Sequence, residues 1–207
     1  MSRIAILDYG MGNLRSVEKA LGRVGARAER TADADRAGDA DGVILPGVGA
    51  LPRAMERVRE LGFDALVAER VEAGRPVLGI CLGMQLLFES SVENEGAEGL
   101  GLLPGPVAAL PANGYKVPHM GWSPVRWERG SALTDGLAAE EPFYFVHSFA
   151  PVPARTEDVL GTAAYGERFV CAVERPPLYG AQFHLEKSSA GGLRLLANFA
   201  AICDSAA

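Results

Sequence analysis

Cys81 has the clearest chemical context in this sequence, because it is the central residue of the segment 79–83, Gly-Ile-Cys-Leu-Gly. The apolar run 76–80 predicts a strand, and residues 82–89 predict a helix. A glycine-flanked side chain at such a junction is typical of a nucleophile elbow, and the start of the following helix favours a thiolate. Cys171 and Cys203 lack this frame and lie in apolar runs, which indicates core positions.

A thiolate nucleophile needs a base, and the base needs a group that orients it. His184 is one of three histidines and follows an apolar run that predicts a strand. Glu186 comes two residues later, and in an extended chain the two side chains would project to the same side. Alone, the pair would suggest a surface salt bridge. Together with the elbow, it predicts His184 as base and Glu186 as its orienter.

The segment 46–49, Pro-Gly-Val-Gly, follows another predicted strand at 42–45. Its glycines allow backbone N–H groups to point into a cleft, where they would stabilise the oxyanion of a tetrahedral intermediate. Glycine-proline turns are common, so the segment by itself is not diagnostic. In an open α/β sheet, however, active sites lie outside the carboxyl ends of the strands. The three segments together therefore predict an acyl-transfer site.

The elements that must position these residues alternate in the first half of the chain. Strands are predicted at 4–9, 26–31, 42–45 and 76–80, and helices at 13–24, 52–60, 64–72 and 82–89. This alternation predicts an α/β fold, with a mostly parallel central sheet and helices on both faces. Strand-like runs between 107 and 182 predict antiparallel additions to the same sheet, before a last helix at 192–203. We expect a single domain over residues 1–207.

The composition, with 48% hydrophobic and 22% charged residues, is that of an ordinary soluble globular protein. The net charge of −6 argues against a nucleic-acid partner, and no apolar run is long enough to span a membrane. Three cysteines without C-x-x-C spacing suit a reducing compartment, so we expect a cytoplasmic protein. The sequence has no Walker-type phosphate loop and no dinucleotide fingerprint, and we expect neither a metal nor a cofactor.

The combined motifs resemble the class I, triad-type glutamine amidotransferases. The resemblance covers essentially the whole chain and is carried by Pro46-Gly47-x-Gly49, Gly79-x-Cys81-x-Gly83-x-Gln85 and Gln182-Phe183-His184-x-Glu186-Lys187-Ser188. Three longer segments are similar to the glutaminase subunits of imidazole glycerol phosphate synthases, enzymes of histidine biosynthesis. These segments are DYGMGNL at 8–14, KVPHMGW at 116–122 and YFVHSF at 144–149.

The resemblance implies a role for each matching residue. Cys81 would attack the carboxamide of glutamine and form a γ-glutamyl thioester, while His184 transfers protons and Glu186 orients it. Backbone N–H groups near Val48 and at Leu82 would form the oxyanion hole. The glutamine pocket would be lined by Gly49, Gln85, His147, Ser148 and Phe149.

The resemblance also implies a partner, a (β/α)8-barrel cyclase subunit that receives the ammonia and makes imidazole glycerol phosphate and AICAR. The heterodimer would be the working unit. Aromatic residues and methionine are enriched at interface cores, so the candidates for the docking face are Met120, Trp122, Tyr144 and Lys187. Trp122 and Tyr144 could equally be core residues, and His119 could belong to either the structure or the interface.

Two residues depart from the family pattern. Leu185 stands where the family usually has proline, and Ser123 stands where it usually has asparagine after the tryptophan. Leu185 preserves the spacing of His184 and Glu186, so a proline at this position should be neutral or mildly stabilising. Ser123 retains a hydrogen-bonding group on a shorter side chain.

Three alternative functions stay open at this level. The chain could be the glutaminase subunit of another synthase, such as anthranilate synthase, but the three longer segments argue against it. A stand-alone thiol hydrolase or peptidase would share the elbow and would need neither Gln85 nor a partner. A catalytically inactive docking subunit would not need an intact triad.

Overall fold

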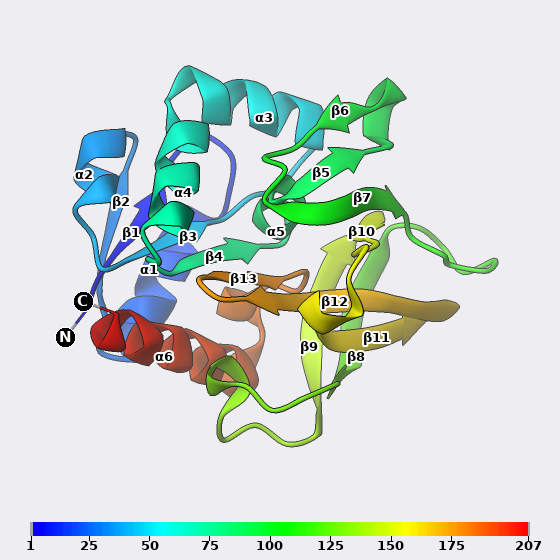
Figure 1. Ribbon diagram of the computed structural model, residues 1–207. Coiled ribbons are helices and arrows are strands. Elements are labelled where there is room, and N and C mark those ends of the chain that lie inside the picture. The colour runs from blue at the N-terminus through cyan, green and yellow to red at the C-terminus, as the bar shows by residue number, and fades with distance from the viewer. Residues whose placement is uncertain (1, 207) are drawn as a thin grey trace.

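The computed structural model describes residues 2–206, apart from the side chain of Glu95, and combines two sheets with helices (Figure 1). The strands are β1 (Arg3–Leu7), β2 (Arg27–Thr31), β3 (Gly42–Leu45), β4 (Val77–Ile80), β5 (Phe88–Ser91), β6 (Ala97–Glu98), β7 (Leu103–Ala109), β8 (His119–Trp127), β9 (Glu140–His147), β10 (Phe149–Pro151), β11 (Val159–Tyr165), β12 (Glu167–Arg175) and β13 (Leu178–Ala181). The α-helices are α1 (Leu14–Arg23), α2 (Ala34–Gly38), α3 (Leu51–Glu60), α4 (Phe63–Glu72), α5 (Leu82–Leu86) and α6 (Ser189–Ser205). Short 3-10 helices are η1 (Glu93–Glu95), η2 (Ala132–Thr134), η3 (Thr156–Asp158) and η4 (Leu185–Lys187).

The larger sheet has nine strands in the order β2-β1-β3-β4-β13-β12-β11-β8-β9. The strands from β2 to β13 in this order pair in parallel. Strands β12, β11, β8 and β9 add to them by antiparallel pairing. The expected α/β fold with antiparallel additions in its second half is confirmed. Because β3 and β4 are parallel neighbours, the segments that follow Leu45 and Ile80 leave the sheet at the same edge.

Helices cover both faces of the parallel half of the sheet (Figure 1). Helices α1 and α6 contribute Leu21 and Phe199 to one apolar core, and helices α3 and α4 contribute Val58 and Phe63 to a second core. All residues of β3 and β4 are buried, because a strand covered on both faces must be apolar on both sides.

The structure corrects three details of the expected elements. The helix after Cys81 ends at Leu86, and residues 88–89 belong to β5, because tertiary pairing of β5 with β7 overrides the local helical pattern. The run 107–110 contributes to β7, which belongs to a second sheet of order β10-β7-β5-β6 and not to the main sheet. Strand β13 pairs in parallel with β4, and only its other neighbour, β12, is antiparallel to it.

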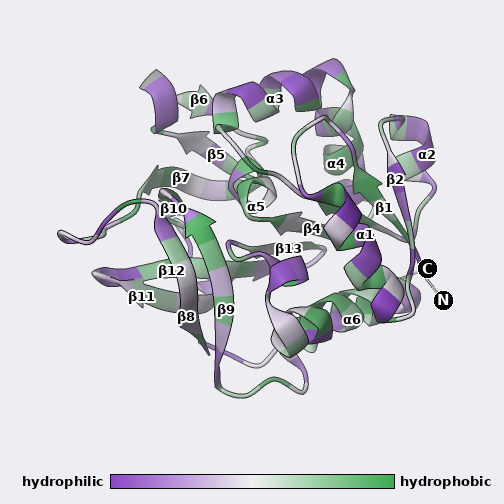
Figure 2. Ribbon diagram, turned by 180° about the vertical axis from the view of Figure 1, so that it is seen from behind, coloured by the Kyte–Doolittle hydropathy of each residue, from purple (hydrophilic) through white to green (hydrophobic). Residues whose placement is uncertain are grey.

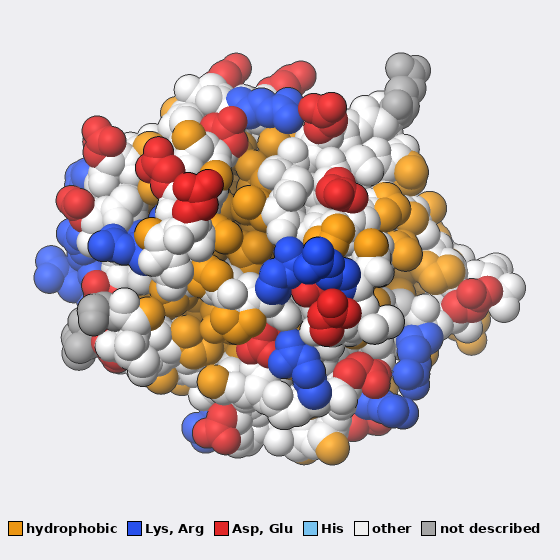
Figure 3. Space-filling view, viewed as in Figure 1, with side chains coloured by type: hydrophobic (Ala, Val, Ile, Leu, Met, Phe, Trp, Pro, Cys, Tyr) orange, Lys and Arg blue, Asp and Glu red, His pale blue; other side chains and the backbone are white. Residues whose placement is uncertain are grey.

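The surface carries charges of both signs. On the face that Figure 3 shows, acidic and basic side chains are interspersed and apolar atoms are visible between them. Within residues 2–206, no helix has both the length and the apolar character needed to cross a lipid bilayer.

Candidate active site

Cys81 occupies a strained turn between β4 and α5. Its φ of 54° and ψ of −112° are backbone angles that residues other than glycine rarely adopt. A Cβ on Gly83 would lie 1.7 Å from the Leu45 carbonyl oxygen, and a Cβ on Gly79 would lie 2.6 Å from the Gly83 carbonyl oxygen. Both positions therefore require glycine, which explains the Gly-x-Cys-x-Gly frame physically.

His184 and Glu186 meet beside this turn. Glu186 Oε1 lies 3.0 Å from His184 Nδ1, and His184 lines the same cavity as Cys81. The expected contact between the two side chains is present, but the extended backbone expected for it is wrong. Residues Leu185–Lys187 form the 3-10 turn η4, with His184 at its N-cap, so the carboxylate reaches the ring across one helical turn.

The surroundings of the pair make His184 a stronger base. Burial lowers its pKa, but the hydrogen bonds and charges of Cys81 and Glu186 outweigh burial and raise the pKa of His184 to about 9. Burial raises the pKa of Glu186, yet its hydrogen bond and ion pair with His184 hold the pKa below the usual value. The carboxylate therefore stays ionised, and the imidazole accepts the thiol proton more readily.

A cavity of about 200 Å³ opens beside Cys81. Figure 2 shows the end of β9 next to α5, and both elements contribute to the cavity wall. Its lining residues are Val48, Gly49, Cys81, Leu82, Gln85, Val146, His147, His184 and Lys187. Larger clefts of about 770 and 550 Å³ lie beside η2 and contain no residue of the triad, so size alone does not mark the site.

Two backbone segments face the cavity as potential oxyanion donors. Leu82 is the first residue of α5, and the N–H groups at a helix start have no intrahelical partner. Val48 and Gly49 approach from β3, with Val48 42% exposed and Gly49 at a φ of +102° that favours glycine. The buried Tyr9 hydroxyl donates to the Pro46 carbonyl oxygen and ties down the start of this segment.

Gln85 is buried and does not point into solvent. Its Nε2 donates to the Phe149 carbonyl oxygen and to Gln182 Oε1, each at 3.0 Å. Gln182 Nε2 in turn lies 3.7 Å from Cys81 Sγ. Ser148 and Phe149 do not line the cavity, and Phe149 acts on it only through this carbonyl. Gln182 is part of a motif that the sequence displays, but no role was expected for its side chain.

Two other polar residues contact the site without having been predicted. Asn13 Nδ2 donates to Glu186 Oε1 at 3.4 Å. Glu93 Oε2 accepts from the Leu51 backbone N–H at 2.8 Å, at the start of α3 and directly after the Val48–Gly49 segment. Asn13 belongs to the 8–14 motif, and that motif could have pointed to a role for its side chain. No local pattern in the sequence indicated the role of Glu93, because its contact joins residues 42 positions apart.

The four candidates for the docking face form a cluster that reaches the cavity. Met120 is 64% and Trp122 51% exposed, so Trp122 is not a core residue. Trp122 and Tyr144 pair across β8 and β9 with ring centroids 6.0 Å apart, and Lys187 Nζ lies 5.8 Å from the Tyr144 ring centroid. Lys187 also lines the cavity, which places exposed apolar side chains beside its mouth.

The described residues contain no arrangement suited to binding a metal ion. Among them, no group of three His, Cys, Asp or Glu side chains is arranged to hold a metal ion. The other two cysteines are buried and reduced. Burial raises the pKa of Cys171 well above its usual value and that of Cys203 to about 12, so both thiols stay protonated.

The family model described as "Glutamine amidotransferase class-I" matches residues 5–203. The chain belongs to the class I glutamine amidotransferases. Curated relatives of this amidotransferase include the imidazole glycerol phosphate synthase subunit HisH of Moorella thermoacetica, 53% identical over 96% of this chain and 94% of that protein. The HisH subunit of Mycolicibacterium paratuberculosis is 48% identical over 95% of this chain and 96% of that protein.

Solved structures share the fold of this amidotransferase at low identity. A putative GMP synthase subunit from Thermoplasma acidophilum has a TM-score of 0.76 at 20% identity, covering 99% of this chain and 95% of that one. The glutaminase domain of Trypanosoma brucei CTPS, solved with bound acivicin, has a TM-score of 0.72 at 18% identity, with 99% and 94% covered. The family match argues against the peptidase alternative.

The amide variant Glu186→Gln tests whether the carboxylate orients His184 and raises its pKa. Glu186→Gln keeps an oxygen that accepts from His184 Nδ1, and the new amide nitrogen takes the place of Oε2, which is buried and unpartnered in the described structure. Geometry is therefore retained while the charge is lost, and the His184 pKa falls. We expect glutaminase kcat/KM to drop about 10- to 100-fold, against about a thousandfold or more for His184→Ala.

The pH dependence of Cys81 alkylation by iodoacetamide reports the fall in the His184 pKa in the amide variant. Circular dichroism serves as the control for folding of both variants. Equal and complete loss of activity in Glu186→Gln and His184→Ala, with the fold intact, would contradict a purely orienting carboxylate.

The departure at Leu185 is tested by restoring the usual residue. His184 has φ −84° and ψ 104°, extended angles that a following proline accepts. Leu185 is 1% exposed, so Leu185→Pro loses some buried apolar surface while it restricts the unfolded chain. These effects, each about 1 kcal/mol, oppose one another, and we expect an unfolding free energy within about 1 kcal/mol of wild type. Urea denaturation measures it, and a large loss of glutaminase activity would show that η4 cannot accept proline.

Proposed function

We propose that this chain is the glutaminase subunit of an imidazole glycerol phosphate synthase. It hydrolyses glutamine to glutamate and ammonia and passes the ammonia to a cyclase subunit, which makes imidazole glycerol phosphate and AICAR. The observation that carries the proposal is that Cys81 and His184 line one cavity while Glu186 is hydrogen-bonded to His184 at 3.0 Å. The HisH relatives, similar over nearly the whole chain, support the synthase and the pathway.

The reaction proceeds in two halves at the Cys81 sulfur. His184 takes the thiol proton, the sulfur bonds to the carboxamide carbon, and a tetrahedral oxyanion forms. The C–N bond then breaks, and His184 returns the proton to the leaving nitrogen, which departs as ammonia. Water, deprotonated by His184, attacks the thioester and releases glutamate and the free thiol. Glu186 orients the imidazole throughout and stabilises it when it is charged.

Backbone donors at Val48 and Leu82 stabilise the oxyanion in this scheme. Leu82 N–H is supported by its place at the start of α5, and the Val48 segment by its place on the cavity wall. Loss of one such donor costs about 3 to 4 kcal/mol of transition-state stabilisation. Gly49, Gln85 and His147 line the adjoining pocket and bind glutamine, with Gln85 held by the Phe149 carbonyl and Gln182.

The partner is a (β/α)8-barrel cyclase subunit, and the two chains work as a heterodimer. Ammonia released into water would be protonated and diluted, so it must leave through a sealed interface. Met120, Trp122, Tyr144 and Lys187 support a docking face, since Met120, Trp122 and Lys187 are exposed and the half-buried Tyr144 ring contacts both Trp122 and Lys187, which lines the cavity. The acidic net charge and the three reduced thiols support a cytoplasmic subunit without a nucleic-acid or membrane partner.

Reconstitution tests this function. The purified chain is mixed with the cyclase and its ribonucleotide substrate, and imidazole glycerol phosphate is measured with glutamine or with ammonium salt as nitrogen donor. We expect glutamine to support synthesis only when this chain is present. Chorismate with the partner subunit of anthranilate synthase is the comparison, and glutamine-dependent anthranilate formation in place of the cyclase product would overturn the proposal.

A further inference from the structure

A chain of hydrogen bonds connects the docking strand β8 with the wall of the cavity. Ser123 Oγ lies 2.9 Å from His119 Nε2, and His119 Nδ1 lies 3.1 Å from His147 Nε2. His147 Nδ1 lies 2.8 Å from the Phe149 carbonyl oxygen. Ser123 is half-buried beside the exposed Trp122, whereas His147 lines the cavity, so the chain leads from near the surface to the glutamine site.

The last acceptor decides the direction of every hydrogen bond in this chain. A carbonyl oxygen can only accept, so His147 must carry its proton on Nδ1. In the neutral ring, Nε2 of His147 then accepts from His119 Nδ1–H, and Nε2 of His119 accepts from the Ser123 hydroxyl. One arrangement of tautomers therefore satisfies all four nitrogens, with both imidazoles protonated on Nδ1. Histidine in water prefers the opposite tautomer, with the proton on Nε2.

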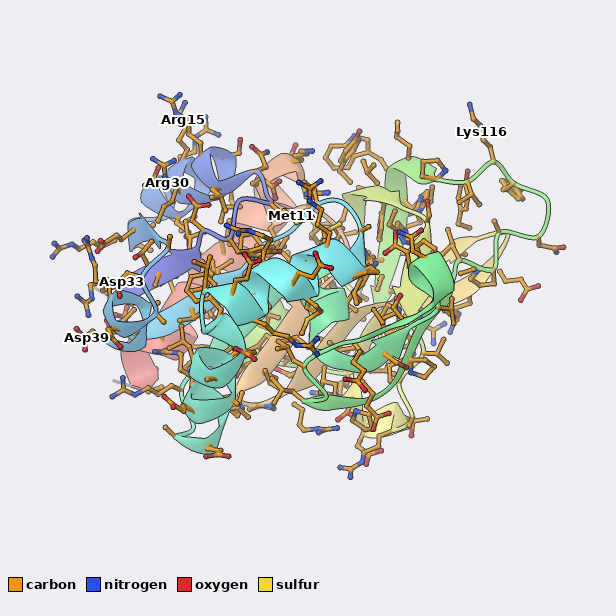
Figure 4. The ribbon with its side chains drawn as sticks, turned by 90° about the horizontal axis from the view of Figure 1, so that it is seen from above. Met11, Arg15, Arg30, Asp33, Asp39 and Lys116 are labelled. Atoms are coloured by element: carbon orange, nitrogen blue, oxygen red, sulfur yellow. The ribbon has the colours of Figure 1, made fainter. Side chains whose placement is uncertain are left out.

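The surroundings keep both rings neutral and fixed. His119 is 1% exposed and stacks on Tyr165 and Phe145, with ring centroids 4.1 and 4.9 Å away. Burial lowers the pKa of His119. Burial also lowers the pKa of His147 to about 4, against its hydrogen bond to Phe149 and helped by the nearby His119 and His184 rings. Tyr165, which covers His119, donates at 2.6 Å to the carbonyl of Lys116, in the projecting segment that Figure 4 shows.

The chain bears directly on the glutamine site because two imidazoles line the same cavity. His184 is hydrogen-bonded to Glu186 beside Cys81, whereas the Nε2 of His147 is already occupied by His119. His147 is thus held away from the role of a second base. The Phe149 carbonyl oxygen accepts from both His147 Nδ1–H and Gln85 Nε2. A rotation of His147 would therefore also disturb the side-chain amide of Gln85.

We propose that His119 and Ser123 are positioning residues, which hold the orientation of His147 and thereby shape the glutamine pocket. This inference rests on the proposed glutaminase function for its kinetic consequence, but not for the tautomers themselves. Neither residue touches the cavity, so each acts only through its neighbour in the chain. The serine, present here in place of the usual asparagine, supplies the hydroxyl donor at the outer end of the chain.

Imidazole nitrogen chemical shifts of the full-length wild-type chain, measured by NMR, test the tautomers without any activity assay. We expect both His119 and His147 to be protonated on Nδ1 and bare on Nε2. In Ser123→Ala, His119 Nε2 loses its donor, so we expect its nitrogen shift to move to that of an unbonded imidazole nitrogen. Both rings should keep their protons on Nδ1, because the Phe149 carbonyl still requires that arrangement. Ser123→Thr keeps the hydroxyl and should leave both spectra unchanged. Protonation of either histidine on Nε2 in the wild type would overturn the inference.

Steady-state glutaminase assays in complex with the cyclase test the consequence for the pocket. Ser123→Ala removes the hydroxyl that holds His119, so His147 is less firmly oriented when glutamine binds. We expect KM for glutamine to rise about tenfold and kcat to change less than about threefold. His119→Phe keeps the aromatic stacking but removes both hydrogen bonds, and should raise KM at least as much. Ser123→Thr should retain the wild-type KM. Unchanged KM in Ser123→Ala would refute the positioning role, whereas absent wild-type glutaminase activity would refute the proposed function and leave the tautomer result standing.

Discussion

Cys81→Ser should abolish glutamine-dependent synthesis, with a fall in kcat/KM of about a thousandfold or more. The serine hydroxyl fits the elbow but ionises far less readily than a thiol, so the attacking anion is lost while the turn at φ 54° is retained. Ammonia-dependent synthesis by the cyclase should stay nearly unchanged, since the variant alters only the ammonia source. The measurement is product formation by the reconstituted complex with either nitrogen donor.

A glutamine-mimicking electrophile provides the control for this assignment. The reagent should label Cys81 and spare Cys171 and Cys203, because both are fully buried and their pKa values are raised by burial. Peptide mass spectrometry locates the label, and Cys81→Ser should remove it. Labelling mainly at Cys171 or Cys203, or full glutamine-dependent activity of the serine variant, would show that the nucleophile lies elsewhere.

The second large effect concerns the partner. The isolated subunit should hydrolyse glutamine slowly, and the cyclase with its ligand should raise the rate at least about a hundredfold, since one misplaced oxyanion donor costs about 3 kcal/mol. The structure supports this expectation through the segment after β3. Its two ends are fixed by Tyr9 at Pro46 and by Glu93 at Leu51, whereas Val48 between them is 42% exposed. Contact with a partner can therefore complete the oxyanion site.

A steady-state glutaminase assay with and without the cyclase measures this activation. Met120→Glu places a charge in the docking cluster and should weaken the activation by raising the cyclase concentration that it needs. Arg30→Glu introduces the same residue on the opposite side of the molecule from the Lys116 segment and serves as the matched control (Figure 4). Its exposed ion pair with Glu18 contributes little to stability. Full activity of the isolated subunit would contradict activation by binding and favour a stand-alone hydrolase.

The nucleophile, the base and the oxyanion segment could be predicted from the sequence because their signals are local. A glycine frame around Cys81, a two-residue spacing between His184 and Glu186 and glycines after an apolar strand each lie within one short segment. Alternating elements predict parallel strands, and parallel strands deliver their carboxyl ends to one edge. The α/β fold and the neighbourhood of the three segments therefore followed from order along the chain alone.

The tertiary structure alone decided the contacts between distant segments. Glu93 reaches Leu51, and His119 reaches His147 because β8 and β9 pair in a register that sets them directly opposite each other. A shift of one residue would turn His119 away from His147, and nothing local to either histidine states which register holds. The same reason applies to β5 and β7, whose pairing built a second sheet from a run with helical character. Periodicity and motif spacing describe what one segment can do, whereas register and packing select which segments meet.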